Sequence, residues 1–500
     1  MRKYSSYIST GILLALFTGT FISCNKLVEI DEPINTITAE KMYRTESQAE
    51  GALAGVYNSL IHGPRTATGS NPANAINNGF GAGLSTLAGG LSAGEFLISS
   101  GSREAYALAT NTLTLMNNSM PNAIWSSAYN VIYHANAVIE GIAGAKNSTM
   151  RDSVKIQYTA EAKFLRAFAY FYLVNFFGEV PLALTIDFNQ TVNLSRAPVS
   201  AVYAQILNDL LDAERDLSAT YAAGKNLRVR VNKWGAKALL AKVHLYMGDN
   251  GQAATKASEV IAEAGLFQLE PLNNVFLSGS KEAILQFKQT NQDATLKNAV
   301  SEGHFFIPPV DPFKGLAPVW ITNELLASFE EGDQRKEIWL DSTLQTNGGL
   351  NVKVWYPVKY KTSRTNSVLN APSPEFYMVL RLADMYLIRA EARANGADGG
   401  YTRAIDDLNA IRFRTSLQNL PATLNASEVK EAVIHEREIE MFAEWGNRWM
   451  DLRRTGRASA VLSAMPVKQP WEGDYQLLYP IPVAEIEANR NLLQNNGYIR

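Results

Sequence analysis

The segment of residues 158–177 constrains the fold of this chain more than any other. Its sequence, YTAEAKFLRAFAYFYLVNFF, would place apolar side chains on almost every side of an α-helix, and Gly178 and Pro181 follow it as helix-stopping residues. A helix that is apolar all round is stable only when other elements cover it. We therefore expect residues 158–177 to form a buried helix at the centre of the fold.

Helical spacing of apolar residues continues on both sides of this segment. Thr45 and Gln48 match a capping box, and the apolar residues that follow, as far as Ile61, lie on one face of a helix. The same spacing predicts further helices at 123–142, 199–221, 233–247, 252–264, 375–395, 402–415 and 427–452. The chain is therefore expected to be mainly α-helical.

Two pairs of these predicted helices resemble tetratricopeptide hairpins, in which small residues let two helices approach closely. The residues at repeat-like positions are Leu240, Ala241, Gly248 and Ala253 in the first pair, and Ala390, Gly396 and Ala404 in the second. We expect a scaffold of helical hairpins.

Two stretches depart from the helical pattern. Residues 64–100 are crowded with glycine and asparagine, and a structureless run of this length in a compact domain is often functional. Residues 265–374 hold many prolines and aromatic residues and two short β-like pieces, 283–287 and 352–360. The second stretch predicts a loop-rich layer on the helical scaffold.

The N-terminus has the pattern of a secretory signal. Arg2 and Lys3 precede an apolar run, and Ser23 comes directly before Cys24, the single cysteine of the chain. The apolar run is too short to span a membrane comfortably, and one cysteine cannot form an internal disulfide. A cysteine at a cleavage point resembles the lipobox of bacterial lipoproteins, although Phe21 stands where leucine is usual. We expect residues 1–23 to be a signal peptide, Cys24 to carry lipid and residues 24–44 to be an extended tether; the alternative is an uncleaved anchor with an incidental cysteine.

Several functional classes find no support in the sequence. The net charge is −2 with both signs mixed, so no basic stripe indicates a nucleic-acid partner. The five histidines are scattered, and no His-Glu-x-x-His, Cys-x-x-Cys or Gly-x-Ser-x-Gly motif occurs. We therefore predict no metal, no cofactor and no catalytic residues.

The densest charged segment is HEREIEMFAEWGNRWMDLRRTGR, residues 435–457. Glu444 and Arg448 are four residues apart, in the order that favours an ion pair on a helix. One interpretation is a binding patch for phosphate or acidic groups. The favoured interpretation is structural: the arginines and carboxylates neutralise one another where the helix docks, with Trp445 and Trp449 packed beneath.

These segments together resemble the SusD/RagB family of outer-membrane nutrient-binding lipoproteins. Phe329, Asp333 and Arg335 match that family's F-x-x-x-D-x-R segment. The resemblance covers nearly the whole chain from Cys24 to Tyr498, and its remaining matches are AEAKFLRAFAYFYLVNFFGEVPL, NKWGAKALLAKVHLYMGD, RLADMYLIRAEARA, HEREIEMFAEWGNRWMDLRRTG and NLLQNNGY.

The resemblance implies a mainly α fold: a scaffold of four tetratricopeptide-like hairpins with a loop-rich second part that contains short β pieces. Its expected regions are an N-terminal helical region, 45–264, and a C-terminal region, 265–500, with the loop-rich insert 265–374. It implies a binding protein without catalysis, lipid-anchored on the outer membrane of a Gram-negative bacterium and exposed at the cell surface. Such proteins capture oligosaccharides, or sometimes peptides, and deliver them to a TonB-dependent SusC-like transporter.

Two other classes stay open. A lipid-anchored glycoside hydrolase would need two carboxylates facing each other across a cleft, and the sequence nominates no such pair. A helical-repeat scaffold that binds only other proteins is the remaining alternative.

The expected ligand site combines aromatic and polar residues of the irregular stretches. Rings that recur on helical faces, such as Phe164 and Phe168, are expected in the core, whereas rings in loops can stack on a sugar. In the resembled family, ligands lie between an early loop and middle-region loops. The candidate residues are Arg65, Asn74, Asn77, Asn78, Phe80, Phe305, Phe306, Trp320, Trp355 and Tyr356. The alternative for any one ring is that it packs its loop onto the scaffold.

Overall fold

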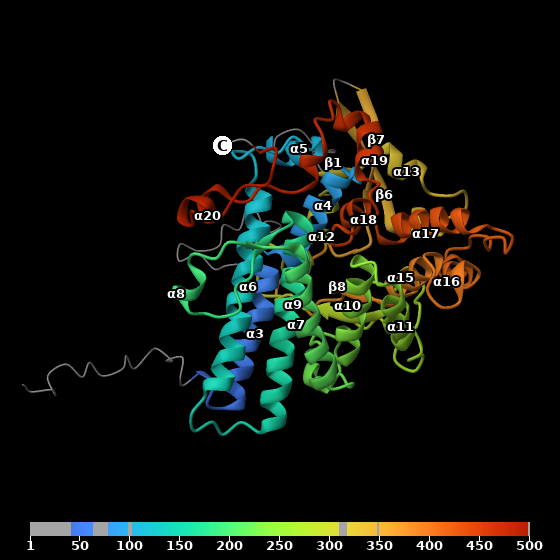
Figure 1. The fold of residues 1–500 in the computed structure, drawn as a ribbon. Helices are drawn as coiled ribbons and strands as arrows, with labels where there is room; N and C mark the ends of the chain where they lie inside the picture. The colour runs from blue at the N-terminus through green and yellow to red at the C-terminus, as the bar shows by residue number, and fades with distance from the viewer. Residues whose placement is uncertain (1–41, 64–78, 99–102, 310–317, 348–349, 499–500) are drawn as a thin grey trace, which may run out of the picture.

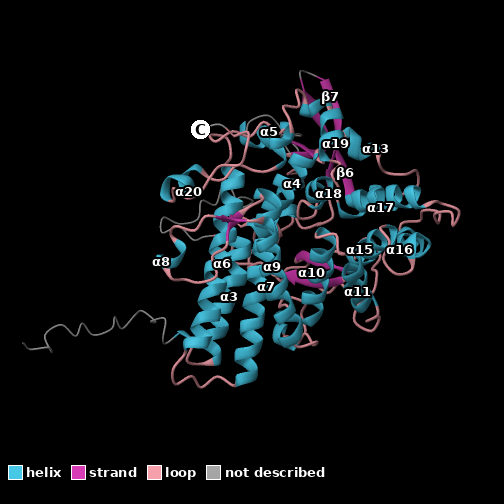
Figure 2. Ribbon diagram, in the orientation of Figure 1, coloured by secondary structure: helices cyan, strands magenta, loops and turns pink. Residues whose placement is uncertain are grey.

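The computed structural model describes residues 42–63, 79–98, 103–309, 318–347 and 350–498. The signal peptide, Cys24 and most of the predicted tether lie outside these residues. The described part is mainly helical, as predicted, with a few short strands (Figure 2).

The helices are α3 (Glu46–His62), α4 (Ser85–Ala93), α5 (Arg103–Thr110), α6 (Ser119–Gly144), α7 (Asp152–Phe177), α8 (Phe188–Thr191), α9 (Val199–Asp216), α10 (Lys233–Tyr246), α11 (Asn250–Ile261), α12 (Ser301–Phe306), α13 (Asn323–Ala327), α14 (Gln334–Trp339), α15 (Leu382–Ala394), α16 (Gly400–Arg414), α17 (Ala426–Met441), α18 (Asn447–Arg454), α19 (Ala458–Ala464) and α20 (Val483–Ala488). The strands are β1 (Phe96–Ile98), β2 (Val180–Pro181), β3 (Arg196–Ala197), β4 (Ala283–Phe287), β5 (Val319–Ile321), β6 (Leu340–Asn347), β7 (Leu350–Pro357) and β8 (Tyr377–Arg381). They form four antiparallel pairs, β1–β5, β2–β3, β4–β8 and β6–β7.

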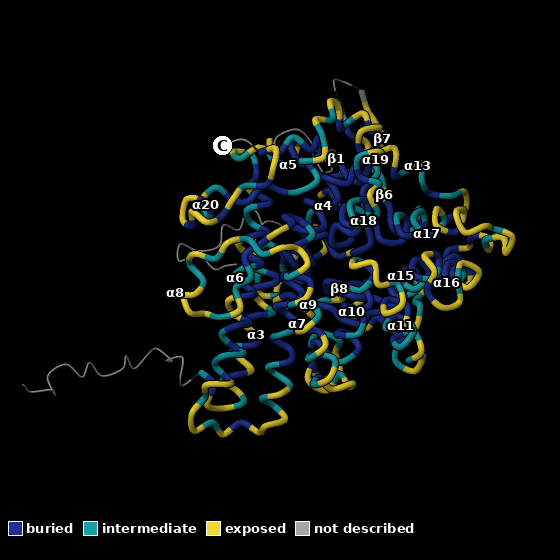
Figure 3. Tube along the Cα trace, in the orientation of Figure 1, coloured by how far each residue is buried: buried dark blue, intermediate teal, exposed yellow. Residues whose placement is uncertain are grey.

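Helix α7 is the predicted central helix. It packs against α3, α6 and α9 (Figure 1), and most of its residues from Ala160 to Phe177 are buried (Figure 3). The ring of Phe168 lies 5.5 Å from that of Trp445, so residues far apart in the sequence meet in one core. The helix begins at Asp152, six residues before the predicted start. Its first two turns are partly exposed and carry several polar residues, so the all-round apolar pattern did not include them.

The two predicted hairpins are present. Helices α10 and α11 pack against each other, α15 and α16 do the same, and α11 packs on α15, so the hairpins stack side by side (Figure 1). Ala241, Ala253, Ala390 and Ala404 are fully buried between these helices. Their small side chains allow the close approach that the sequence predicted.

The predicted helix at 375–395 is wrong in its first part. Residues Tyr377–Arg381 form strand β8, which pairs with β4. Aromatic and β-branched residues favour a strand when a partner strand is available, and the partner lies almost a hundred residues earlier in the chain.

The predicted helix at 427–452 is interrupted between α17 and α18. Ala443, Trp445 and Gly446 adopt positive φ angles of 55°, 55° and 71°. A Cβ atom on Gly89 of α4 would lie 2.5 Å from the Cα of Gly446, so the two backbones touch. The break lets α4 pack closely against the turn at Gly446. The sequence could not predict the break, because the contact joins segments that are far apart in the chain.

The glycine content of residues 64–100 suggested a structureless run, and this prediction is wrong for the described part, residues 79–98. From Phe80 onward the chain forms a π-helical turn, Phe80–Leu84, then α4 and β1. Every residue of α4 is buried. Small residues, here Gly, Ala, Ser and Thr, let neighbouring elements approach a helix closely on several sides. The same composition is common in loops, so the sequence alone suggested a loop here.

One large hydrophobic core extends from Tyr43 to Tyr498 and includes both halves of the chain. Smaller apolar clusters lie under α15–α17 and under the β6–β7 hairpin.

Candidate functional site

Trp320 is the middle residue of β5, which pairs with β1 in a two-stranded antiparallel sheet. In its register Leu97 lies opposite Trp320, with Ile98 opposite Val319. Val319 and Ile321 are buried, whereas Trp320 between them is half-buried. Side chains alternate across a strand, so Trp320 points to the face away from the main core.

Trp320 packs against a small apolar cluster on the β6–β7 hairpin that includes Tyr356. The cluster under this hairpin consists of Val354, Tyr356 and Val358, with Ile307 and Trp320 packed against it. The phenol of Tyr356 donates a hydrogen bond to Oδ2 of Asp341 at 3.0 Å. Burial, together with the Asp341 carboxylate, raises the pKa of Tyr356 well above its usual range, so this phenol stays a neutral donor.

Trp355 lies on the other face of the same hairpin. Lys353, two residues earlier, places its ammonium 4.4 Å from the Trp355 ring centroid. The half-buried Trp355 ring packs against the main core rather than the Trp320 cluster. The structure therefore brings Trp320 and Tyr356 together and separates Trp355 from them.

The three candidate phenylalanines differ in exposure. Phe305 is half-buried, with the guanidinium of Arg364 5.2 Å from its ring centroid. Phe306 is buried against Phe96, with 5.3 Å between the rings. Phe80 is fully buried, 6.0 Å from Phe168 and 5.6 Å from Tyr172.

Phe80 and Phe306 therefore pack in the core, and we leave them out of the site proposed below. The four polar candidates Arg65, Asn74, Asn77 and Asn78 lie outside the described residues.

A buried charge network lies behind the site, and sequence reasoning did not find most of it. Arg381 reaches Glu282 at 3.0 Å, Glu440 at 2.6 Å and Glu444 at 2.9 Å. Arg335, from the F-x-x-x-D-x-R segment, pairs with Asp333 at 2.8 Å and also reaches Glu440. Burial raises the pKa of Glu440, but its four positive neighbours, Arg414, Arg381, Arg335 and Lys359, hold that pKa well below the usual range.

These contacts confirm the structural interpretation of residues 435–457, but the Glu444–Arg448 pair that the spacing favoured is replaced by others. Arg448 pairs with Glu438 at 2.5 Å, and Glu444 pairs with Arg381 and Lys359, because the helix breaks before Asn447. The carboxylates of that segment are neutralised by arginines and lysines inside the protein, and Trp445 and Trp449 are buried. Lys359, which follows β7, pairs with Glu444 at 2.5 Å, and burial lowers its pKa to about 8. The network thus ties the end of the hairpin to α17.

Two buried carboxyl groups lie beside the β1–β5 ribbon. Glu95 directly precedes β1, and Glu302 lies in α12, which packs on β5. Burial raises the pKa of each to about 7. Oε1 of Glu302 accepts a hydrogen bond from Thr86 at 3.2 Å, and Oε2 has no partner among the described residues. This region therefore gains or loses charge near neutral pH.

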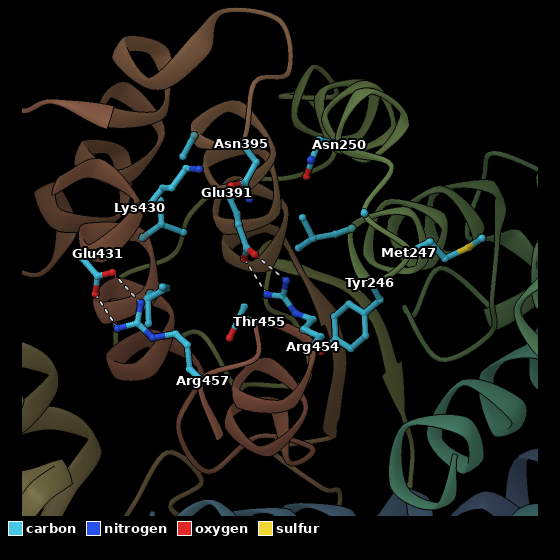
Figure 4. A pocket seen from close by; sticks show the side chains of 15 residues that line it. Tyr246, Met247, Asn250, Glu391, Asn395, Lys430, Glu431, Arg454, Thr455 and Arg457 are labelled. Atoms are coloured by element: carbon cyan, nitrogen blue, oxygen red, sulfur yellow. Dashed lines mark hydrogen bonds and ion pairs between the residues drawn. The ribbon is translucent and has the colours of Figure 1, made fainter. Parts of the chain in front are cut away.

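A polar cavity of about 560 Å³ lies among the ends of α10, α15, α17 and α18 (Figure 4). Arg454 and Glu391 form a two-pronged ion pair across it, at 2.6 and 2.7 Å, and Arg457 pairs with Glu431 at 2.7 Å. Both guanidiniums that line the cavity are already paired, so an anionic ligand would gain little from them, and the exposed ammonium of Lys430 is the cationic group of the lining left to meet it.

Within the described ranges, no helix combines the length and apolar character needed to cross a bilayer. Residues 94–245 match a family model described as "Starch-binding associating with outer membrane", and residues 319–498 match the model of the SusD family, SusD/RagB. The chain belongs to the SusD/RagB family. The two matches together span about two thirds of the sequence, so both halves carry the family pattern, and the resemblance stated from the sequence is confirmed.

Relatives of this SusD/RagB chain include SusD-like protein P2 of Formosa agariphila, 27% identical over the full length of both chains. The starch-binding protein SusD of Bacteroides thetaiotaomicron is 26% identical over 70% of this chain and 74% of its own. A laminarin-binding SusD-like protein has a similar structure, with a TM-score of 0.73 and 26% identity over 91% of this chain and 100% of its own. The names of the last two describe binding proteins.

Proposed function

We propose that this protein is a cell-surface, glycan-binding lipoprotein that captures oligosaccharides without cleaving them. It is anchored through Cys24 and passes its ligand to a TonB-dependent SusC-like transporter. Membership of a starch- and glycan-binding family supports the binding role, and the relatives named for starch and laminarin suggest neutral glucans as the first ligands to test.

The observation that carries the proposed site is the half-buried Trp320 held between two pairs of strands. Its backbone is fixed by pairing with β1, and its ring rests on the cluster of Val354, Tyr356 and Val358. A rigid ring with one face supported and the other accessible can stack on the apolar face of a sugar at little entropic cost. We propose Trp320 as the centre of the site, with the buried Tyr356 supporting its ring as part of the hairpin cluster. Phe305 and Trp355 are proposed as outlying contacts, and Arg65, Asn74, Asn77 and Asn78 as further contacts.

Native gel electrophoresis of the purified protein in gels containing starch or laminarin tests this proposal. We expect retarded migration in at least one gel, with no new reducing ends after long incubation with the same polysaccharide. Release of oligosaccharides would indicate a hydrolase. Unchanged migration without products in both gels would contradict glucan capture and favour the scaffold alternative.

A further inference from the structure

A second groove with exposed aromatic rings lies between α6, α8 and α20, on the side of the molecule away from α16 (Figure 1). Its volume is about 340 Å³, at the lower end of the range of about 300–1,000 Å³ typical of ligand pockets. Trp125, Tyr129 and Tyr133 of α6, Phe188 of α8 and Glu485 of α20 line it. These elements are different from those that present Trp320.

The aromatic residues of α6 form a row along one side of the helix. Trp125, Tyr129 and Tyr133 are spaced four residues apart and therefore lie on the same face, about 6 Å apart along the axis. The first two rings are 4.9 Å apart and form the inner part of the row. Tyr133 is 52% exposed, and Phe188 across the groove is 71% exposed. Trp125 is buried and Tyr129 is half-buried, so Tyr133 and Phe188 are the two rings that the groove exposes widely to solvent.

The polar groups of the groove favour a ligand that donates hydrogen bonds. The carboxylate of Glu485 is half-buried and has no hydrogen bond or ion pair with any described residue, and burial raises its pKa. The phenol of Tyr129 donates to the carbonyl of Pro181 at 2.7 Å, which leaves its oxygen as an acceptor. The amide of Asn136 is already bonded to Ala183 and Arg166.

The charge of the lining excludes one class of glycan. Among the described residues that line the groove there is no lysine or arginine, and Glu485 supplies the one carboxylate. An acidic ligand would find no counter-ion in the lining itself and would meet the Glu485 carboxylate; the guanidinium of Arg196, close to Tyr129, is already bonded to the carbonyls of Glu179 and Leu493. Hydroxyl groups can donate to that carboxylate, and the apolar faces of sugar rings can cover the exposed aromatic rings.

We propose that this groove is a second oligosaccharide-binding site, selective for neutral glycans, in which Tyr133 and Phe188 stack on sugar rings and Glu485 accepts hydrogen bonds from hydroxyls. This inference rests on the proposed function, since it assigns a second site for the same ligand class. Helices α6 and α8 lie within residues 94–245, the part that matches the family model described as starch-binding.

Isothermal titration calorimetry of the full chain with maltohexaose, laminarihexaose and hexagalacturonate tests the inference. We expect two equivalents of a neutral hexasaccharide to bind the wild type. The double variant Tyr133→Ala/Phe188→Ala and the variant Glu485→Gln should each lose at least about tenfold in affinity at one of the two sites. Phe413→Ala, which removes an exposed ring from distant α16, is the matched control and should bind like the wild type.

The variant Trp320→Ala separates this inference from the proposed function. Two equivalents, one lost with Trp320→Ala and the other with the groove variants, support both sites. A single equivalent that only Trp320→Ala abolishes overturns the second site and leaves the proposed function intact. A single equivalent that only the groove variants abolish supports the groove and removes Trp320. Binding of neither neutral hexasaccharide overturns both, and equal binding of hexagalacturonate in the groove overturns the selectivity for neutral glycans.

Discussion

The substitution Trp320→Ala is the sharpest test of the proposed site. Trp320 is half-buried on a strand whose neighbours Val319 and Ile321 face the core, so the change removes an accessible ring and leaves the core side chains in place. A ring stacked on a ligand contributes about 1 kcal/mol, judged from aromatic pairs, which corresponds to an affinity loss of about fivefold. We expect at least this loss in calorimetric titration with the glucan that the wild type binds.

The stability of the same variant decides whether the loss is specific. Trp320 contacts only a small cluster, so we expect little change in melting temperature, whereas Val319→Ala, one residue away and facing the core, should destabilise by about 2 kcal/mol without changing affinity. An unchanged affinity of Trp320→Ala would refute the reasoning. A drop in melting temperature as large as that of Val319→Ala would show that Trp320 is a structural residue.

Three further predictions concern the anchor and the core. Cys24→Ala should move the protein from the membrane fraction to the soluble fraction; continued sedimentation with membranes would contradict lipid anchoring. Burial raises the pKa of Glu302 from 4.5 to about 7, so its contribution to stability is full below about pH 4.5 and is lost as the pH rises through about 7. Glu302→Gln should therefore reduce the fall in melting temperature between pH 5.5 and pH 8.5, and an unchanged pH profile would exclude this group. The buried amino group of Lys468, whose pKa burial lowers well below its usual range, donates to the carbonyls of Leu91 at 2.7 Å and Ser92 at 3.0 Å at the end of α4. Lys468→Met should therefore cost about 2–4 kcal/mol in urea unfolding and the exposed control Lys430→Met almost nothing; equal effects would contradict this role.

The sequence was sufficient for features that depend on local pattern. The apolar run 158–177 predicted α7 because an all-round apolar helix has only one stable environment. Small residues such as Ala241 and Ala390 predicted the hairpins, because close helix packing requires them at fixed positions. The strand at 283–287 was also found, since its apolar run lies between turn-forming residues.

The features that failed depend on contacts between distant segments. The turn at Gly446 exists because α4 touches it, and β8 is a strand because β4 lies beside it. The partners of Arg381 come from Glu282, Glu440 and Glu444, and no spacing rule connects them. For the same reason, the sequence could nominate Trp320 and Trp355 together but could not tell that Trp320, on β5, packs against one face of the β6–β7 hairpin while Trp355 lies on the other face.

A crystal structure of the protein soaked with laminarihexaose or maltohexaose tests the central claim most directly. The account predicts a sugar ring stacked on the indole of Trp320, with every glycosidic bond intact. A glycan bound only at sites that do not touch Trp320, or a cleaved glycan at any site, would contradict it.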